Sequence, residues 1–416
     1  METEVKFTSF AIHTPRDIVF GRGKSALLAS YLPATAKRVL VISGRHAAES
    51  EAKTIADNLS DSGREVRIFS ETMAEPSPGA VDTAAAAVRA WNADAVVAVG
   101  GGSVIDTAKA AAALSRLDGS CIEYFNGTRE LVVTDRPFFA ALPTTSGTGA
   151  EMTNNSVLTD PATKIKKSIR HPGMTADLAV VDPELTVNCP RGVTVASGLD
   201  ALVQAVEAFV SPKGTAYTRA LAKAAACKLY GALKRITHES WKDAGDEPVP
   251  GIAFRVDMAE GSMLAGMAFA HAGLGAVHGL AHPVGSLLHV PHGVSCAILM
   301  LPVFQFNMNA CGRLYAELAH AFLPKEPRPD AALFIAAMRE LSLGLGVPDH
   351  LRDYGLAEEH LPFIVANCRS NSMKNIQPGG GKARHPHGVS GGGALGGDPP
   401  GRARPLYAPK GGADPA

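Results

Sequence analysis

The chain has 416 residues, 46% of them hydrophobic and 19% charged, and its 40 basic residues balance 40 acidic ones. This length favours two domains, and zero net charge excludes the electrostatic footprint of a nucleic-acid-binding protein or of a chain held at an anionic membrane. We expect no apolar run to span a bilayer and find no signal peptide at the start, which predicts a cytoplasmic protein. The six cysteines have no paired spacing and are typical of reduced thiols.

The first half of the chain alternates short apolar runs with alanine-rich helical patterns. The expected strands lie at 38–43, 94–103, 138–151 and 178–185. Helical periodicity occupies 49–63 and 79–92. Continuous apolar strands between helices are typical of a parallel sheet that is covered on both faces. We therefore predict a doubly wound α/β domain over residues 1–190.

The second half contains long helical patterns without strands between them. They cover 194–211, 215–236 and 251–273, and Thr194 is the expected N-cap of the first. We predict a helical domain over 191–375. The segment 376–416 is rich in Gly and Pro and cannot build a core, so it is predicted to be disordered. Either a natural extension or a shifted reading frame explains such a tail.

Two loops follow apolar strands and carry groups that suit phosphate. Gly101, Gly102 and Ser103 stand between a strand and a helix, where backbone N–H groups form an anion site. A plain glycine turn is the alternative for this loop alone. The second loop, PTTSGTGAE (143–151), adds the hydroxyls of Thr144, Thr145 and Thr148. Two such strand ends in one sheet favour a nucleotide in the crevice, although the GxGxxG fingerprint is absent.

Residues 271–293 contain a cluster of five histidines, namely His271, His278, His282, His289 and His292. His278 and His282 have the spacing of a helical ligand pair, but Pro283 follows and can end or kink the helix. Imidazoles with a carboxylate suit Zn, Fe or similar divalent ions. Asp200 supplies a carboxylate on an otherwise apolar helical stripe, where it is either a metal ligand or a first-turn residue favoured by the helix dipole.

Taken together, these motifs resemble the iron-containing (group III) alcohol dehydrogenase family. The matching segments are GGGSVIDTAK (100–109), PTTSGTGAE (143–151), VDPELT (181–186), SGLDAL (197–202) and GLGAVHGLAHPVGSLLHVPHG (273–293). The resemblance implies a dehydroquinate synthase-like architecture, with an α/β dinucleotide-binding domain followed by an all-helical domain. It also implies a divalent metal, Fe or Zn, between the domains, a small alcohol or aldehyde substrate, and a homodimer.

The resemblance assigns the metal ligands to Asp200, a position four residues later, and two histidines fourteen residues apart, His278 and His292. The second ligand position, usually His, falls here on Gln204, whose amide oxygen is a weaker donor toward Fe or Zn. His282 matches the family histidine that lies near the substrate and relays a proton. His271 and His289 match no ligand position and are interpreted as surface or pocket-wall residues.

For the cofactor, the resemblance places Gly101, Gly102, Ser103 and Asp106 at the pyrophosphate. It places Thr144, Thr145, Thr148 and Lys167 at the nicotinamide and ribose. Members that prefer NAD often carry an acidic residue where this chain has Gly44, and Arg45 follows. We therefore favour NADP over NAD, with NAD left open. The alternative functions are a metal-free reductase resembling maleylacetate reductases, a lyase resembling dehydroquinate synthases, and a nucleotide-binding protein without catalysis.

Overall fold

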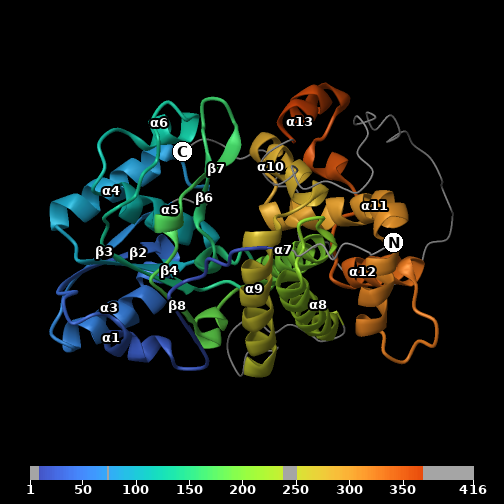
Figure 1. Ribbon diagram of the computed structural model, residues 1–416, viewed down its shortest axis with the longest axis horizontal. Helices are drawn as coiled ribbons and strands as arrows, with labels where there is room; N and C mark the ends of the chain where they lie inside the picture. Colours follow the sequence, from blue (N-terminus) through green and yellow to red (C-terminus); the bar gives the residue numbers. More distant parts are fainter. Residues whose placement is uncertain (1–8, 73–74, 238–250, 369–416) are drawn as a thin grey trace, which may run out of the picture.

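The computed structural model describes residues 9–72, 75–237 and 251–368, and it divides into a sheet-containing half and a helical half (Figure 1). The predicted tail at 376–416 lies outside the described residues. The predicted fold class is confirmed: an α/β N-terminal part is followed by a helical C-terminal part. The last strand of the main sheet ends at Val181, and the first long helix of the helical half begins at Arg191.

The main sheet has six parallel strands in the order β1-β8-β5-β4-β2-β3. Their bounds are β1 Asp17–Phe20, β2 Arg38–Gly44, β3 Glu65–Thr72, β4 Ala95–Gly100, β5 Phe138–Pro143 and β8 Leu178–Val181. An antiparallel hairpin of β6 (Asn155–Thr159) and β7 (Lys166–Arg170) stands apart from this sheet. Because all six strands are parallel, their carboxyl ends share one edge of the sheet.

Helices cover both faces of the sheet, as the continuous apolar strands predict. One face packs against α1 (Leu28–Tyr31) and α3 (Glu51–Asp61). The other packs against α4 (Pro78–Trp91) and α5 (Gly102–Leu114). The short helices α2 (Arg45–Ala48) and α6 (Cys121–Asn126) follow β2 and α5.

The helical half is built around α7, which packs against α8, α9 and α11. The helices are α7 Arg191–Val210, α8 Ala216–Ile236, α9 Ile252–Ala272, α10 Ala276–Leu288, α11 His292–Phe322, α12 Ala331–Gly344 and α13 Leu361–Asn367. The prediction of Thr194 as N-cap was wrong. The helix begins three residues earlier, after Pro190, and the N–H of Thr194 already donates to the Pro190 carbonyl.

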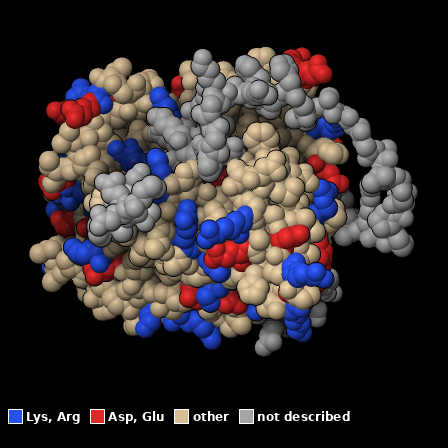
Figure 2. Space-filling view, turned by 45° about the vertical axis from the view of Figure 1, so that its right-hand side comes forward, with Lys and Arg blue, Asp and Glu red and all other residues tan. Residues whose placement is uncertain are grey.

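Two helices, α7 and α11, are long and apolar enough to cross a membrane by length and composition, contrary to the expectation from the sequence. In the structure, 78% of the most apolar window of α7 and 50% of that of α11 is buried. Their apolar side chains form the core of the helical half together with those of α8, α9 and α12. On the face shown in Figure 2, basic and acidic side chains lie interspersed among the described residues.

The two halves touch closely at the loop after β5. A Cβ added to Gly147 would stand 2.6 Å from the Cβ of Ser197 on α7. Gly149 has a φ of +56°, and an added Cβ there would stand 2.6 Å from the Cα of Gly266 on α9. Glycine is required at both positions because a larger residue would force the loop away from the helices.

Candidate metal centre and cofactor crevice

One face of α7 carries three polar side chains in an otherwise apolar core. Asp200, Gln204 and Glu207 are four and three residues apart, which places them on the same side of the helix. Each is at least 96% buried. Burial of two carboxylates on one helix face requires compensating partners, and the neighbouring helices α10 and α11 supply them.

Those partners form a compact group of possible metal ligands. Asp200, His278 of α10, and His292 and Cys296 of α11 each offer one donor atom, and the four atoms lie within 4.8 Å of one another. His278 Nε2 is 3.1 Å and His292 Nε2 is 3.7 Å from Asp200 Oδ1. Cys296 Sγ is 3.7 Å from His292 Nε2. The structure therefore brings three predicted ligands together and adds a thiol that the sequence analysis did not consider.

The thiol could have been found from its spacing. Cys296 follows His292 by four residues, so both lie on one face of α11 near its beginning. The sequence analysis read the cysteines only for disulfide and CxxC patterns, and therefore missed a His-x-x-x-Cys pair. The start of α11 lies close to α7, and glycine at position 293 permits this approach. A Cβ added to Gly293 would stand 2.1 Å from the Ala196 carbonyl oxygen. This approach brings His292 to Asp200.

Glu207 orients His278 from the side opposite Asp200. Its carboxylate accepts hydrogen bonds from the backbone N–H groups of Gly275 (2.9 Å) and Val277 (2.7 Å) and lies 2.7 Å from His278 Nδ1. Because an ionised carboxylate only accepts, Nδ1 carries a proton and Nε2 is turned toward Asp200. Carboxylate–histidine pairs of this kind fix the ring and tautomer of metal-binding histidines.

Burial and mutual charge set the protonation of the group. Burial acts to raise the pKa of Asp200, but the neighbouring His292 and His278 outweigh it and hold the pKa below its usual range. Burial acts to lower the pKa of His278, but Cys296, Asp200 and Glu207 raise it well above its usual value. Burial raises the pKa of the Cys296 thiol to about 12. A positive charge is thus favoured between Asp200 and His278, where a proton or a cation can supply it.

His282 and His292 are disposed to stay neutral. Burial is the main cause that lowers the pKa of His282 well below its usual value, and the nearby charges of Lys166 and His278 act in the same direction. Burial lowers the pKa of His292 to about 3, although Asp200 opposes the shift. The rings of the two histidines lie 5.3 Å apart. Neutral imidazoles bind metal or relay protons, whereas imidazolium cannot bind metal.

The helix that carries His278 and His282 continues past Pro283, so both stay four apart on α10. The helix does not end at Pro283. Pro283 and Val284 are buried, and packing holds the helix although Pro283 donates no backbone hydrogen bond. Only His278 takes part in the donor group. His282 lies beside it, and its Nδ1 has no hydrogen-bond partner among the described residues. His271 accepts from the His13 N–H, and His289 is exposed at the end of α10.

Gln204 presents its donor end to Asp200. Its Nε2 donates to Asp200 Oδ2 at 3.0 Å, and its Oε1 is buried without a hydrogen-bond partner in the described part of the chain. An amide N–H cannot bind a cation. In this arrangement Gln204 therefore orients Asp200. Its unsatisfied amide oxygen is a polar atom that a bound ligand could satisfy.

The glycine and threonine loops lie against each other at the carboxyl edge of the sheet, the edge at which parallel α/β sheets form the crevice for their ligands. The N–H of Thr144 donates to the Gly100 carbonyl, and a Cβ added to Gly102 would stand 2.4 Å from Thr148 Oγ1. Gly101 precedes α5 and places no side chain at the beginning of the helix. Gly44 ends the neighbouring strand β2. A dinucleotide bound at this edge of the sheet would bring its phosphates close to the backbone of these loops.

Two predicted cofactor residues have other partners in the structure. Asp106 Oδ2 accepts from the Val157 N–H at 3.0 Å, which ties α5 to the hairpin. Lys167 Nζ lies 4.4 Å from the centre of the Phe125 ring. Its neighbour Lys166 points to the opposite face of β7 and lowers the pKa values of His282 and His292. Strand alternation therefore favours Lys166 over Lys167 as the lysine that faces the histidines.

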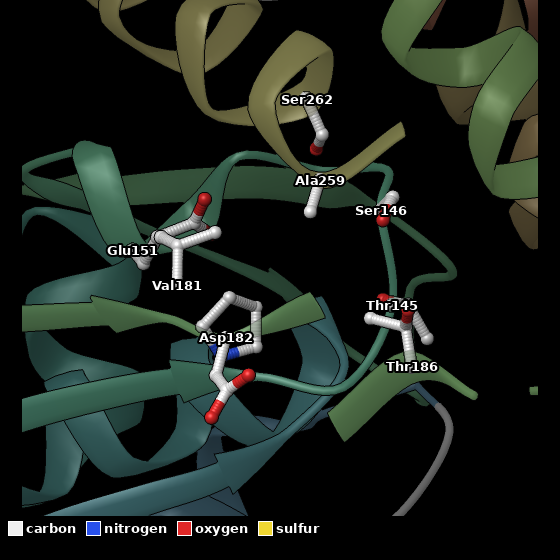
Figure 3. A pocket seen from close by; sticks show the side chains of 9 residues that line it. Thr145, Ser146, Glu151, Val181, Asp182, Thr186, Ala259 and Ser262 are labelled. Atoms are coloured by element: carbon white, nitrogen blue, oxygen red, sulfur yellow. The ribbon is translucent and has the colours of Figure 1, made fainter. Parts of the chain in front are cut away.

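A small pocket lies between the sheet edge and α9 (Figure 3). Its lining includes Thr145 from the predicted cofactor loop and Ser262 from α9. Glu151 also lines it, and burial raises the pKa of its carboxyl to about 7. Asp182 lines it as well, but its carboxylate already accepts from the N–H groups of Gly23 and Ser25. Glu151 ends the PTTSGTGAE motif, and the sequence analysis assigned it no role.

A nucleotide-type crevice beside a buried group of metal ligands is typical of a metal-dependent dehydrogenase. Residues 15–183 match the family model for iron-containing alcohol dehydrogenase, and residues 194–381 match that for the C-terminal part of the Fe-containing alcohol dehydrogenase family. The chain therefore belongs to the iron-containing alcohol dehydrogenase family. It is an oxidoreductase that acts on alcohols or aldehydes.

Individual relatives agree with this membership. The chain is 36% identical over 323 residues to long-chain-alcohol dehydrogenase 1 of Geobacillus thermodenitrificans, covering 76% of this chain and 78% of that protein. It is 31% identical to the NAD-dependent methanol dehydrogenase of Bacillus methanolicus, covering 89% and 96%. Among solved structures, a 1,3-propanediol oxidoreductase superimposes with a TM-score of 0.81 at 29% identity, covering 88% and 95%.

A structure with bound cofactor is also similar. Sulfoacetaldehyde reductase from Bifidobacterium kashiwanohense in complex with NAD+ superimposes with a TM-score of 0.78 at 27% identity, covering 89% of this chain and 94% of that one. Together with the family model, this supports a nicotinamide cofactor and a metal for the chain.

Proposed function

We propose that the chain catalyses reversible hydride transfer between a small primary alcohol or aldehyde and a nicotinamide nucleotide, at a divalent metal held by Asp200, His278 and His292. The observation that carries the proposal is the buried group of oxygen and nitrogen donors within 4.8 Å of one another. Asp200, one member of this group, lies about one turn along α7 from Ser197. Gly147 of the PTTSGTGAE loop lies against Ser197. Such donors suit iron or zinc.

Different side chains are proposed to bind the metal and to move the alcohol proton. When bound, a divalent metal would supply Lewis-acid polarisation of the alcohol or carbonyl group, and a nicotinamide nucleotide would supply the hydride donor or acceptor. Asp200, His278 and His292 hold the metal, and Glu207 fixes the ring of His278. His282 is buried and neutral, and its Nδ1 is available to take the alcohol proton and pass it on.

The proposed cofactor is NADP(H), with NAD(H) as the alternative. Support comes from the end of β2, where Gly44 leaves no carboxylate to repel a 2′-phosphate and Arg45 is exposed to pair with one. Gly101, Gly102 and Ser103 would approach the pyrophosphate from the start of α5. Thr144, Thr145 and Thr148 would line the nicotinamide and ribose side. The assignment of Asp106 to the phosphate loop stays a prediction.

The test is the reduction of a series of primary aldehydes of increasing length by the metal-loaded chain. The oxidation of NADPH or of NADH measures the rate. We expect turnover that requires metal and disappears in Asp200→Ala. Turnover that persists in the metal-free chain would instead favour a metal-free reductase. Bound metal and cofactor without turnover on any aldehyde would contradict the dehydrogenase proposal. The homodimer and the absence of nucleic-acid or membrane partners remain predictions, and light scattering tests the first.

A further inference from the structure

We propose that Cys296 is the fourth metal ligand of this chain, in the role that the family gives to the imidazole at position 204, and that the resulting Asp-His-His-Cys set selects zinc. The inference rests on the proposed metal site and concerns which side chains complete it.

The distances of the thiol fit a shared metal. With ligand bonds of about 2.0–2.3 Å, the donor atoms of a tetrahedral site stand about 3.3–3.8 Å apart. Cys296 Sγ is 3.7 Å from His292 Nε2, and that nitrogen is 3.7 Å from Asp200 Oδ1. His278 Nε2, at 3.1 Å from the same oxygen, completes the group. These three separations are close to those of ligands around one ion, and the remaining pairs of donor atoms lie within 4.8 Å of each other.

The thiol also supplies a metal donor that Gln204, in its observed orientation, does not. The Gln204 amide approaches Asp200 through Nε2, which donates a hydrogen bond and cannot bind metal. Cys296 is fully buried beside the same carboxylate and comes from α11, on which His292 is also a member of the group. The chain carries glutamine rather than an imidazole at position 204 of α7, and it has a sulfur donor within reach on α11.

Coordination changes the chemistry of the thiol. As the ion binds, the S–H bond breaks, the proton leaves to solvent, and the sulfur electron pair forms the bond to the metal. A thiolate is a soft ligand, which favours zinc over harder ions. Zinc also comes after iron(II) in the order of increasing intrinsic affinity for nitrogen and sulfur donors, so it binds them more tightly than iron(II) does. The set of one oxygen, two nitrogens and one sulfur therefore favours zinc over iron in this chain.

The alternative is a cysteine that only fills the core, since Cys296 also contacts the apolar cluster of the helical half. The test is cobalt(II) substitution of the intact chain, together with zinc affinity measured by competition with a chelator. Wild-type protein should show an intense near-ultraviolet sulfur-to-cobalt charge-transfer band. Cys296→Ser should lose this band and bind zinc about 100-fold more weakly, since loss of even an outer-shell partner commonly costs 10–100-fold.

Two control variants make the result decisive. Cys311→Ser alters another buried cysteine of α11 and should keep both the band and the affinity. Gln204→Ala should keep the band. A wild-type protein that binds cobalt without the band, or a zinc affinity that falls in Gln204→Ala but not in Cys296→Ser, would overturn the inference while leaving the metal site intact. Failure of the wild-type chain to bind any divalent metal would instead contradict the proposed function.

Discussion

Glu207→Gln isolates the contribution of the carboxylate that orients His278. Glu207 accepts three hydrogen bonds, two of them from backbone N–H groups, and its side chain is 3% exposed. Glutamine has the same shape but one acceptor oxygen, so its NH2 group must face at least one of the donors. A buried donor left without a partner costs about 1–3 kcal/mol, which we expect as a loss in the free energy of unfolding of the metal-free chain.

A second effect should appear in metal binding. Loss of a charged outer-shell partner weakens metal affinity about 10–100-fold, which corresponds to about 1.4–2.7 kcal/mol. Chelator competition measures the zinc affinity, and denaturant unfolding of the metal-free chain measures the stability. Glu317→Gln is the control, because this exposed glutamate pairs with the exposed Lys223 and should change neither quantity beyond about 0.5 kcal/mol. An unchanged zinc affinity together with lowered stability would refute the reasoning, since Glu207 would then serve only to hold α10 to α7.

Three further predictions concern the cofactor crevice and its surroundings. Gly44→Asp should lower kcat/KM for NADPH about 10- to 100-fold relative to NADH, because a carboxylate there repels a 2′-phosphate and accepts from a ribose hydroxyl; steady-state kinetics with both cofactors measure the ratio. Glu151 stays protonated in the folded chain up to pH about 7 but ionises near 4.5 when unfolded, so its burial costs stability as pH rises between these values. Unfolding at pH about 5 and about 8 should show wild-type stability falling by about 2–3 kcal/mol relative to Glu151→Gln, and parallel curves would contradict this. Gly147→Ala should lower kcat about 10- to 100-fold without loss of bound zinc, because its Cβ would press against Ser197 and shift the loop; a parallel loss of zinc, measured by elemental analysis, would contradict this separation.

Much of the fold follows from patterns that a single sequence contains. The apolar strands at 38–43 and 94–103 predict a buried parallel sheet, because no half-exposed strand would be apolar on both faces. Helix ends are less well determined. Thr194 has the chemistry of an N-cap, but Pro190 stands where α7 begins, and Thr194 is instead buried and bonded to Arg255.

The donor group was only partly predictable, because three of its members come from helices whose contacts are long-range. Spacing alone favoured His278 with His282, whereas the structure pairs His278 with His292 across two helices. The resemblance assigned that pair correctly as neighbours but directed attention to Gln204 rather than to Cys296. The His-x-x-x-Cys spacing places Cys296 on the same face of α11 as His292, but no local pattern predicts the packing of α11 against α7 that brings both side chains to Asp200.

The loop after β5 lies next to the helix that carries part of the donor group. Gly147 touches Ser197, and Ser197 lies three residues before Asp200 on α7, so the two share one side of the helix. The loop begins with the threonines of the crevice, two of which stand directly after β5. A nicotinamide bound along these threonines, as proposed, would be held by a segment that is in contact with the helix that supplies the carboxylate. Hydride transfer requires the two reacting partners to stay aligned to within a fraction of an ångström, and a glycine at 147 permits that contact without an intervening side chain.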